Sequence, residues 1–319
     1  MKIINNKNQV KDSLSNNCML WHGDVENFLD ALPKGLYFDL IITSPPYNIG
    51  KPYEKPQELK EYMKWQEKVI KKCLKFLKPT GSICWQVGNF IQKGKTGKES
   101  SVLPLDILFF DIFRKHNLKL RNRIIWHFGH GLQCKHRFSG RYEVVLWFTK
   151  TDDYIFELDP IRVKSKYPGK KHFKGPKKGQ YSGNPKGKNP EDLWSINSEM
   201  LTTWDNPVWE IPNVKSNHVE KTEHPCQFPI ALVDRFILSM TPVGGLVFDP
   251  FAGVASTGIA SVINERRFWG CEIDDTYIKI GEDRLLQALN GEAKYRPFEK
   301  PVYDHTQSNL SKEPLRNEN

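Results

Sequence analysis

The sequence has few cysteines and no pattern that would hold a metal. The chain of 319 residues contains six cysteines, and no two of them form a C-x-x-C pair. His127, His130 and His136 lie near one another, but no carboxylate or cysteine arrangement completes a ligand set. Neither a zinc site nor a disulfide framework is indicated, and we interpret the cysteines as reduced thiols in a cytosol.

Long apolar runs are also missing. The first residues, Met1 to Asn6, have no long apolar core, and no run in the chain approaches the length of a membrane span. These absences predict a soluble, intracellular protein. The length is sufficient for one large α/β domain with a small inserted or appended one.

Acidic residues are absent from residues 161–190, which contain ten lysines and arginines. The charge of this segment therefore equals the +10 of the whole chain. A charge run is often only a solvated or disordered face, but the interleaved aromatics and the lack of any acid favour contact with nucleic-acid phosphates. We predict such contacts for Lys164, Lys170, Lys171, Lys174, Lys177 and Lys178, and for Arg137 in an earlier glycine-punctuated loop. Gln180, Asn184 and Asn189 are candidates for contacts to base edges.

One stretch combines a predicted strand with two consecutive prolines. Leu40–Ile42 has the length and β-branched content of a buried strand, and Ser44-Pro45-Pro46 ends it. Two prolines cannot donate to a sheet ladder and they fix φ, so the strand ends in a rigid turn. That turn places a hydroxyl, a carbonyl and the ring of Tyr47 at the carboxyl edge of a sheet, where open α/β sheets bind ligands. Alone, the pattern is also typical of an ordinary strand-ending turn.

A second turn, which contains a glycine, lies far downstream. Leu246–Phe248 is predicted to be a strand, Asp249 to Gly253 a turn, and Ser256–Ile263 the start of a helix. Glycine lets a backbone approach a ligand closely, and N–H groups at a helix start bind anions. The turn lacks the G-x-G-x-x-G pattern, which argues against a nicotinamide site. Glu272 ends the next predicted strand, at a spacing where a carboxylate binds ribose hydroxyls.

Together the two turns resemble a known family. Thr43-Ser-Pro-Pro-Tyr-Asn48, followed far downstream by Asp249-Pro-Phe-Ala-Gly253, looks like the amino-methyltransferases of DNA, and the motif order resembles their β group. The resemblance covers about residues 18–290. It implies an α/β, Rossmann-like methyltransferase fold, a mostly parallel doubly wound sheet, with an inserted basic target-recognition region. It also implies S-adenosylmethionine as the methyl donor and S-adenosylhomocysteine as the product.

The resemblance assigns roles to particular residues. It implies that Ser44, Pro45, Pro46 and Tyr47 are catalytic. It implies a cofactor site formed by Asp24, His224, Asp249, Pro250, Phe251, Gly253, Ser256 and Glu272. Asp24 fits equally well as the N-cap of the helix that follows it. Phe228 and Ala255 depart from the lysine and the glycine that are usual in relatives.

The domain boundaries follow from the same match. Residues 18–150 are predicted to form the catalytic half of the methyltransferase domain, 151–217 the target-recognition region, and 218–290 the cofactor-binding half. Residues 291–319 are predicted to be a disordered tail, and residues 1–17 a loose polar arm. Trp194, Trp204 and Trp209 would give the recognition region a small apolar core.

The implied chemistry requires an amine to become a better nucleophile. The exocyclic amine of adenine or cytosine is a poor nucleophile, because its lone pair is delocalised into the ring. Hydrogen bonds accepted from that amine by Ser44 Oγ and the Pro45 carbonyl would favour a pyramidal nitrogen. Positioning of two bound reactants would supply most of the rate. The target base must be flipped out of the duplex, and stacking on Tyr47 would hold it.

Two bases remain open as the target. Ser44 stands where adenine enzymes often have Asp, a pattern more usual for N4-cytosine enzymes. Arg123-Ile-Ile-Trp126, Arg141-Tyr-Glu143 and Gly187-Lys-Asn-Pro190 resemble N6-adenine members. We predict N6-adenine methylation of a short duplex DNA sequence, with N4-cytosine methylation as the alternative. A restriction-modification system is the expected setting, with a cognate restriction endonuclease as a candidate partner.

Other classes of protein fit less well. A catalytically silent DNA-binding protein on the same fold need not keep the catalytic, glycine and ribose-carboxylate positions together. An RNA or protein amine methyltransferase could share the Pro-Pro-Tyr turn, but the long basic insert favours duplex DNA. The expected location is the cytoplasm, for a bacterial or phage-encoded enzyme that works as a monomer or homodimer without a membrane partner.

Overall fold

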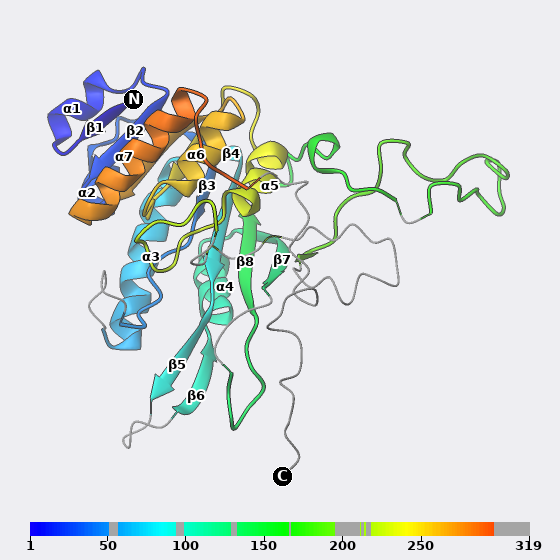
Figure 1. The fold of residues 1–319 in the computed structure, drawn as a ribbon, viewed down its shortest axis with the longest axis horizontal. Coiled ribbons are helices and arrows are strands. Elements are labelled where there is room, and N and C mark those ends of the chain that lie inside the picture. The colour runs from blue at the N-terminus through cyan, green and yellow to red at the C-terminus, as the bar shows by residue number, and fades with distance from the viewer. Residues whose placement is uncertain are drawn as a thin grey trace, which may run out of the picture.

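The computed structural model describes residues 1–50, 57–93, 99–128, 133–165, 167–194, 211, 214 and 218–296. Within these residues the main sheet has nine strands in the order β1-β2-β11-β10-β3-β4-β8-β7-β9 (Figure 1). Its strands are β1 (Lys2–Ile4), β2 (Cys18–His22), β3 (Phe38–Thr43), β4 (Leu77–Val87), β7 (Lys119–His127), β8 (Tyr142–Thr149), β9 (Leu193–Trp194), β10 (Leu246–Asp249) and β11 (Arg267–Glu272). A separate hairpin consists of β5 (Asn89–Lys93) and β6 (Glu99–Pro104).

The two motif-bearing strands are neighbours in the sheet, although they are far apart in sequence. β10 pairs in parallel with β3, with Val247 opposite Leu40 and Phe248 opposite Ile41. The chain runs from β10 to β11 in one direction and from β3 to β4 in the other, so the strand order reverses between β10 and β3. Ligands of open α/β sheets bind at the carboxyl ends of the strands at such a reversal. The predicted α/β fold is confirmed.

Helices cover both faces of the sheet, and strand residues alternate between the two cores. On one face, apolar side chains of α2 (Val25–Ala31), α3 (Leu59–Lys75) and α4 (Leu105–Lys115) pack with Phe38 and Ile41 of β3. On the other, α5 (Ile230–Met240), α6 (Ser256–Ile263) and α7 (Asp275–Leu289) pack with Leu40 and Ile42. The predicted start of α6 is confirmed. Each central strand is buried on both sides, which explains its continuous apolar run.

The part of the sheet beyond β4 is antiparallel. β8 pairs antiparallel with β7, and Trp126 lies opposite Glu143. β8 also pairs antiparallel with β4, with Val87 opposite Val144. Because β8 runs against β4, the start of β8 lies at the carboxyl ends of β3 and β4. Glu143 is therefore brought to the edge where the Pro-Pro turn begins.

The prediction of a loose N-terminal arm is wrong. β1 pairs in parallel with β2, and α1 (Lys7–Asp12) begins at Asn6, whose side chain accepts a hydrogen bond from the Gln9 amide at 3.2 Å. Ile4 is 1% exposed and Val10 is fully buried. Two buried apolar side chains and a helix cap fix a segment whose composition is otherwise polar.

The start of β4 also differs from the prediction. The Pro79-Thr80-Gly81 sequence predicts a break between a helix and a strand that begins at Ser82, but β4 begins at Leu77, two residues after α3 ends. The extra residues form an irregularity between the pairs Phe38–Leu77 and Leu40–Ser82. The strand accommodates the proline because a bulge leaves a backbone N–H without a ladder partner.

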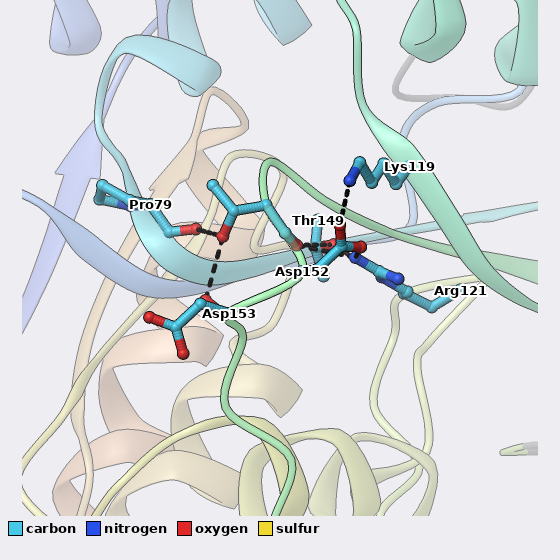
Figure 2. Close-up of polar contacts among 7 residues, drawn as sticks. Pro79, Lys119, Arg121, Thr149, Asp152 and Asp153 are labelled. Carbon is cyan, nitrogen blue, oxygen red and sulfur yellow. Dashed lines mark hydrogen bonds and ion pairs between the residues drawn. The ribbon is translucent and has the colours of Figure 1, made fainter.

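Residues that follow β8 are fixed to the edge of the sheet. Arg121 donates to Thr149 Oγ1 at 2.8 Å and to Asp152 Oδ1 at 2.7 Å, and Lys119 pairs with the same carboxylate. Figure 2 shows these contacts converging on the turn after the strand. Thr151 Oγ1 donates to the Pro79 carbonyl at 3.0 Å. The first residues of the predicted recognition region therefore belong, by packing, to the sheet.

The basic segment leaves the body of the fold after Val163 and returns at β9. η1 (Asp159–Ile161) packs against α5, and Ile161 and Val163 are buried in the second core. Val163 and Lys188 exchange backbone hydrogen bonds of 3.0 and 2.8 Å, which close the base of the excursion. Gly187 is required there, because a Cβ atom would lie 2.2 Å from the Val163 carbonyl oxygen. The excursion extends away from α5 as a long green loop (Figure 1).

Some residues with predicted roles lie outside the described ranges. Trp204 and Trp209 lie there, as do residues 297–319 of the predicted tail. His130 also lies outside the described residues. Among the helices of the described residues, none is long and apolar enough to cross a membrane.

Candidate active site

A cavity of about 260 Å³ lies at the carboxyl ends of β2, β3, β10 and β11. All the residues that the sequence predicted as catalytic or cofactor-binding line it: Asp24, Ser44, Pro45, Pro46, Tyr47, His224, Asp249, Pro250, Phe251, Gly253, Ser256 and Glu272. The structure therefore places residues from several separate stretches of the chain around one hollow. The cavity wall also contains residues that the sequence did not single out: Gln57, Tyr62, Trp65, Cys226 and Tyr277.

The Pro-Pro turn is held from outside by two side chains. Tyr62 of α3 donates its hydroxyl to the Pro46 carbonyl at 2.7 Å. Asn48, at φ 60°, donates to the Gln57 carbonyl at 2.8 Å and accepts from the Gln57 amide at 2.7 Å. Asn is one of the few residues that tolerate this left-handed conformation. Asn48 therefore supports the turn.

Ser44 and Tyr47 are joined by their hydroxyl groups, with 3.1 Å between Ser44 Oγ and Tyr47 Oη. Tyr47 Oη in turn lies 3.3 Å from Glu143 Oε2. Gln86 at the end of β4 donates to the same carboxylate oxygen. Burial raises the pKa of Glu143 to about 7, and the hydrogen bonds from Tyr47 and Gln86 oppose that rise. A half-buried titratable carboxyl therefore lies behind the predicted catalytic turn.

Sequence reasoning missed the role of Glu143 in this cluster. The Arg141-Tyr-Glu143 stretch was noted only for its resemblance to adenine-modifying enzymes. Its one local signal was a carboxylate at the start of an apolar strand. Such a position shows nothing about its neighbours until β8 is paired with β4 and β7.

The carboxylate of Asp249 is used inside the protein. Asp249 Oδ1 accepts from Thr43 Oγ1 at 2.6 Å and from the Phe251 amide at 3.0 Å, and Oδ2 accepts from Thr257 Oγ1 at 2.6 Å. Burial raises the pKa of Asp249 to about 6. The side chain is 3% exposed. It fastens the glycine turn to the last residue of β3, so the two turns are directly joined.

Glu272 also holds the glycine turn. Its Oε2 accepts from the Gly253 amide at 2.8 Å, and its Oε1 accepts from the Ile273 and Asp274 amides at 2.9 and 2.8 Å. Burial raises the pKa of Glu272, and these backbone donors favour the ionised form. Oε1 already accepts from two amides, whereas Oε2 accepts from one and keeps a lone pair for a hydroxyl donor from the cavity.

His224 lines the cavity as a neutral imidazole. Burial lowers its pKa to about 4, and Lys221 acts in the same direction. Nδ1 accepts from the Cys226 amide at 3.2 Å, and the ring contacts the Tyr277 ring edge to face. A Cβ atom at Gly253 (φ 53°) would lie 3.3 Å from His224 Nε2. Glycine at this position thus permits both the left-handed turn and the close approach of the imidazole.

Asp24 does cap a helix, as one of its two interpretations predicted. Its Oδ1 accepts from the amides of Glu26 and Asn27 at 2.9 and 3.1 Å, at the start of α2. The residue also lines the cavity. The two interpretations are therefore compatible in geometry.

The predicted DNA-contacting lysines lie on the surface of the excursion. Lys164, Lys170, Lys171, Lys174, Lys177 and Lys178 are all exposed. Within the described residues, none of these six has an ion pair, whereas Arg162 and Lys186 pair with Asp159, and Lys188 pairs with Glu191. Phe173 and Tyr181 are 89% and 68% exposed beside them. Arg137 is half-buried in a separate loop, next to Phe138, which is 99% exposed.

Comparison with known proteins identifies the class to which this fold and site belong. A family model described as DNA methylase, for the N6 and N4 methyltransferases, matches residues 38–283. The chain therefore belongs to this DNA methylase family, and the predicted resemblance is confirmed.

Similar curated relatives include type II methyltransferases. M.BglII of Bacillus subtilis is 43% identical over 273 residues, which cover 86% of this chain and 69% of the relative. M.ScaI of Streptomyces caespitosus is 33% identical over 273 residues, which cover 84% and 81%. The DNA adenine methyltransferase YhdJ of Escherichia coli K12 is 32% identical over 269 residues, which cover 83% and 81%.

Solved structures of DNA methyltransferases share the fold. The PvuII DNA methyltransferase, which is cytosine-N4-specific, matches with a TM-score of 0.60 at 21% identity over 87% of this chain and 94% of its own. A putative DNA modification methylase from Thermus thermophilus, in complex with S-adenosyl-L-methionine, matches with a TM-score of 0.59 at 22% identity over 85% and 94%.

Proposed function

We propose that this DNA methylase transfers a methyl group from S-adenosylmethionine to the exocyclic amine of a base in a short duplex DNA sequence. The observation that carries the proposal is the shared cavity of the two turns. Acceptor groups of Ser44 and Pro45 face the same hollow as the glycine turn and the carboxylate of Glu272. Thr43 joins the two turns through Asp249.

The residues of the cavity fit S-adenosylmethionine by the chemistry of their donors and acceptors. Glu272 Oε2 would accept a hydrogen bond from a ribose hydroxyl, and Asp24 would accept one from the adenine amino group. The backbone amides at the start of α6, where Ser256 lines the cavity, suit the amino-acid carboxylate. When bound, S-adenosylmethionine supplies an electrophilic methyl group.

The chain's own residues would act on the amine. Ser44 Oγ and the Pro45 carbonyl would accept hydrogen bonds from it, and Tyr47 would stack on the ring of a flipped base. Trp65 and Phe251, whose ring centroids are 5.6 Å apart, form an apolar wall of the same cavity. Such a wall excludes water and strengthens the polar contacts inside the site.

We propose the N6 amine of adenine as the acceptor, supported by the similarity to the DNA adenine methyltransferase of E. coli. The N4 amine of cytosine is the second candidate, and Ser44 is the observation that favours it. Both amines present two N–H donors, so both suit the acceptor pair of Ser44 and Pro45. The setting that we propose is a restriction-modification system in a bacterial cytoplasm, with a cognate endonuclease of the same sequence specificity.

Sequencing of modified genomic DNA tests the reaction and the base together. The protein would be expressed in a methylation-free host, and single-molecule sequencing would read both strands. N6-methyladenine in one short motif is the expected result, and N4-methylcytosine would keep the reaction but change the base. Soluble protein that binds S-adenosylmethionine and leaves DNA unmodified would contradict the proposal.

The exposed lysines of the excursion test the mode of DNA binding. Replacement of Lys174, Lys177 and Lys178 by Gln should weaken DNA binding and reduce the slope of log K against log salt by about 0.9 for each phosphate that is no longer neutralised. Lys186→Gln with Lys188→Gln is the matched control, because both lysines are already ion-paired. Equal salt slopes for the triple variant and the wild type would remove this segment from the DNA interface.

A further inference from the structure

The carboxyl of Glu143 lies at the end of a chain of hydrogen bonds that leads to Ser44. Gln86 of β4 donates to Glu143 Oε2, and Tyr47 Oη contacts the same oxygen at 3.3 Å. Tyr47 Oη then contacts Ser44 Oγ at 3.1 Å. The backbone of Gly88 closes this cluster, since a Cβ atom there would lie 3.2 Å from the Tyr47 ring and 3.5 Å from Glu143 Oε1.

The direction of each hydrogen bond follows from the number of protons available. An ionised carboxylate only accepts, so Glu143 accepts from both Gln86 and Tyr47. A phenol has one hydroxyl proton, and that of Tyr47 is directed to Glu143. The contact between Tyr47 and Ser44 therefore requires Ser44 to be the donor. The serine proton then points toward Tyr47, and both serine lone pairs remain to accept.

We propose that Glu143 is a positioning residue that, through Tyr47, turns the Ser44 hydroxyl into an acceptor for the amine of the target base. This inference rests on the proposed function and deepens it. A serine hydroxyl on its own can direct either its proton or a lone pair at a neighbouring group. The hydrogen bonds from Gln86 through Glu143 and Tyr47 fix the direction of the serine proton. A neutral serine can then accept a hydrogen bond from the target amine, as an aspartate would because of its charge.

The ionisation of Glu143 gives this arrangement a pH dependence. Its pKa is raised to about 7. A protonated Glu143 can donate to Tyr47, and the tyrosine proton is then available to Ser44. The serine proton is released toward the base, where it opposes the amine N–H. The rate of methyl transfer is therefore expected to fall as the pH drops through 7.

Other titratable groups around the cluster are separable from Glu143. The pKa of Asp249, which binds Thr43 next to Ser44, is raised to about 6. The pKa of His224 is lowered to about 4, and burial also lowers that of His127 on β7. Tyr47 contributes a phenol. A pH effect of any of these groups would persist after Glu143 is replaced.

The test is a single-turnover measurement of methyl transfer by the Glu143→Gln variant on its duplex substrate. Because Gln86 and Tyr47 both contact Oε2, the amide can place there either a neutral oxygen, which holds the tyrosine proton less firmly than an ionised carboxylate, or an N–H donor, which turns that proton toward Ser44. We expect a loss of at least about tenfold in the methyl-transfer rate at pH 8 and the disappearance of the rise in rate around pH 7. Affinity for S-adenosylmethionine should stay within about twofold of wild type. Glu67→Gln, on the outer part of α3, is the control for a carboxylate lost elsewhere.

A second variant and a spectroscopic readout keep the inference testable if Glu143→Gln folds poorly. Tyr47→Phe retains the ring but breaks the chain, so it should show the same loss, and the double variant should be no slower than either single one. In protein labelled at the tyrosine ring carbons, the Tyr47 resonances should titrate near pH 7 in the wild type. They should not do so in Glu143→Gln.

The outcomes separate this inference from the proposed function. Wild-type protein that fails to methylate DNA contradicts the proposed function. A wild type that methylates DNA, with variants at Glu143 and Tyr47 that keep its rate and its pH profile, overturns only the role of Glu143. Additive losses of rate in the double variant would also overturn it, because two substitutions in the same hydrogen-bond chain should cost no more than either one alone.

Discussion

The turn after β3 and the turn after β10 begin side by side in the sheet, but their polar groups have different partners. In the glycine turn, the Asp249 carboxylate accepts from Thr43, Thr257 and the Phe251 amide, all of which belong to the protein. In the Pro-Pro turn, the supports come from outside, through Tyr62 and Gln57. The acceptors of Ser44 and Pro45 are left beside the cavity.

The glycine turn uses its acidic side chain to hold its own conformation, whereas the Pro-Pro turn leaves its polar groups available to a ligand. An acidic residue in a motif is often read as a ligand-binding group, but Asp249 is 3% exposed and is hydrogen-bonded on both oxygens. Its buried position makes it the fastening between two loops. Proline performs the equivalent task in the other turn, because it fixes φ without using a polar side chain.

The largest effect is expected from Ser44→Ala. Loss of the hydroxyl removes one acceptor for the target amine, so the methyl-transfer rate should fall by about 100- to 1,000-fold. Cofactor binding should be nearly unchanged, as isothermal titration with S-adenosylmethionine would show. Ser44→Asp restores an acceptor and should be faster than the alanine variant. Unchanged turnover in Ser44→Ala would remove Ser44 from the mechanism.

Asp249→Ala should act on folding more than on any single contact to a ligand. It leaves two buried hydroxyls and one amide without their acceptor, at a cost of about 3 kcal/mol or more in the free energy of unfolding. Denaturant titration measures that loss. A fully stable variant with weakened cofactor affinity would show that Asp249 belongs to the binding surface instead.

Asp249→Asn tests the burial of the Asp249 carboxylate through the pH dependence of the free energy of unfolding. The pKa of Asp249 in the folded protein, about 6, is above its ordinary value of 3.8. Its contribution to stability is therefore present below pH 4 and is lost as the pH rises through 6. The stability of wild type relative to Asp249→Asn should be greater at pH 5 than at pH 8. A pH-independent difference between the two proteins would contradict this burial argument.

The smallest effect on stability is expected from Asp24→Ser, which keeps a good N-cap but removes the carboxylate. The free energy of unfolding should change by less than about 0.5 kcal/mol, whereas Asp24→Ala should lose about 1 kcal/mol. Affinity for S-adenosylmethionine should fall by about tenfold in both variants. If the serine variant binds the cofactor like the wild type, Asp24 is a helix cap alone.

Features of the fold that depend on local pattern could be predicted from the sequence. The run Leu40–Ile42 is apolar throughout and is followed by Pro45 and Pro46, so its strand could be predicted from the local sequence alone. The same holds for α5 and for the start of α6, which follow a proline and a glycine turn. The N-terminal β1 and α1 were missed, because each is short and only Ile4 and Val10 show that it is buried.

The candidate site divides in the same way. Ser44 and Gly253 stand in motifs whose residues are contiguous, so their places at the cavity could be predicted from sequence. The partners of Tyr47 could not, because Glu143 reaches it only through the pairing of β8 with β4. The internal use of Asp249 likewise depends on Thr43, which comes from a strand far away in sequence.

The most direct test of the central claim follows a labelled methyl group. Purified protein, S-adenosylmethionine with a labelled methyl group and duplex DNA carrying the recognition sequence would be combined, and the digested nucleosides analysed by mass spectrometry. The account predicts label on an exocyclic amine, N6 of adenine in the first instance, at a rate greatly reduced in Ser44→Ala. Label at a ring carbon, label confined to RNA or protein, or an unchanged rate in Ser44→Ala would contradict it.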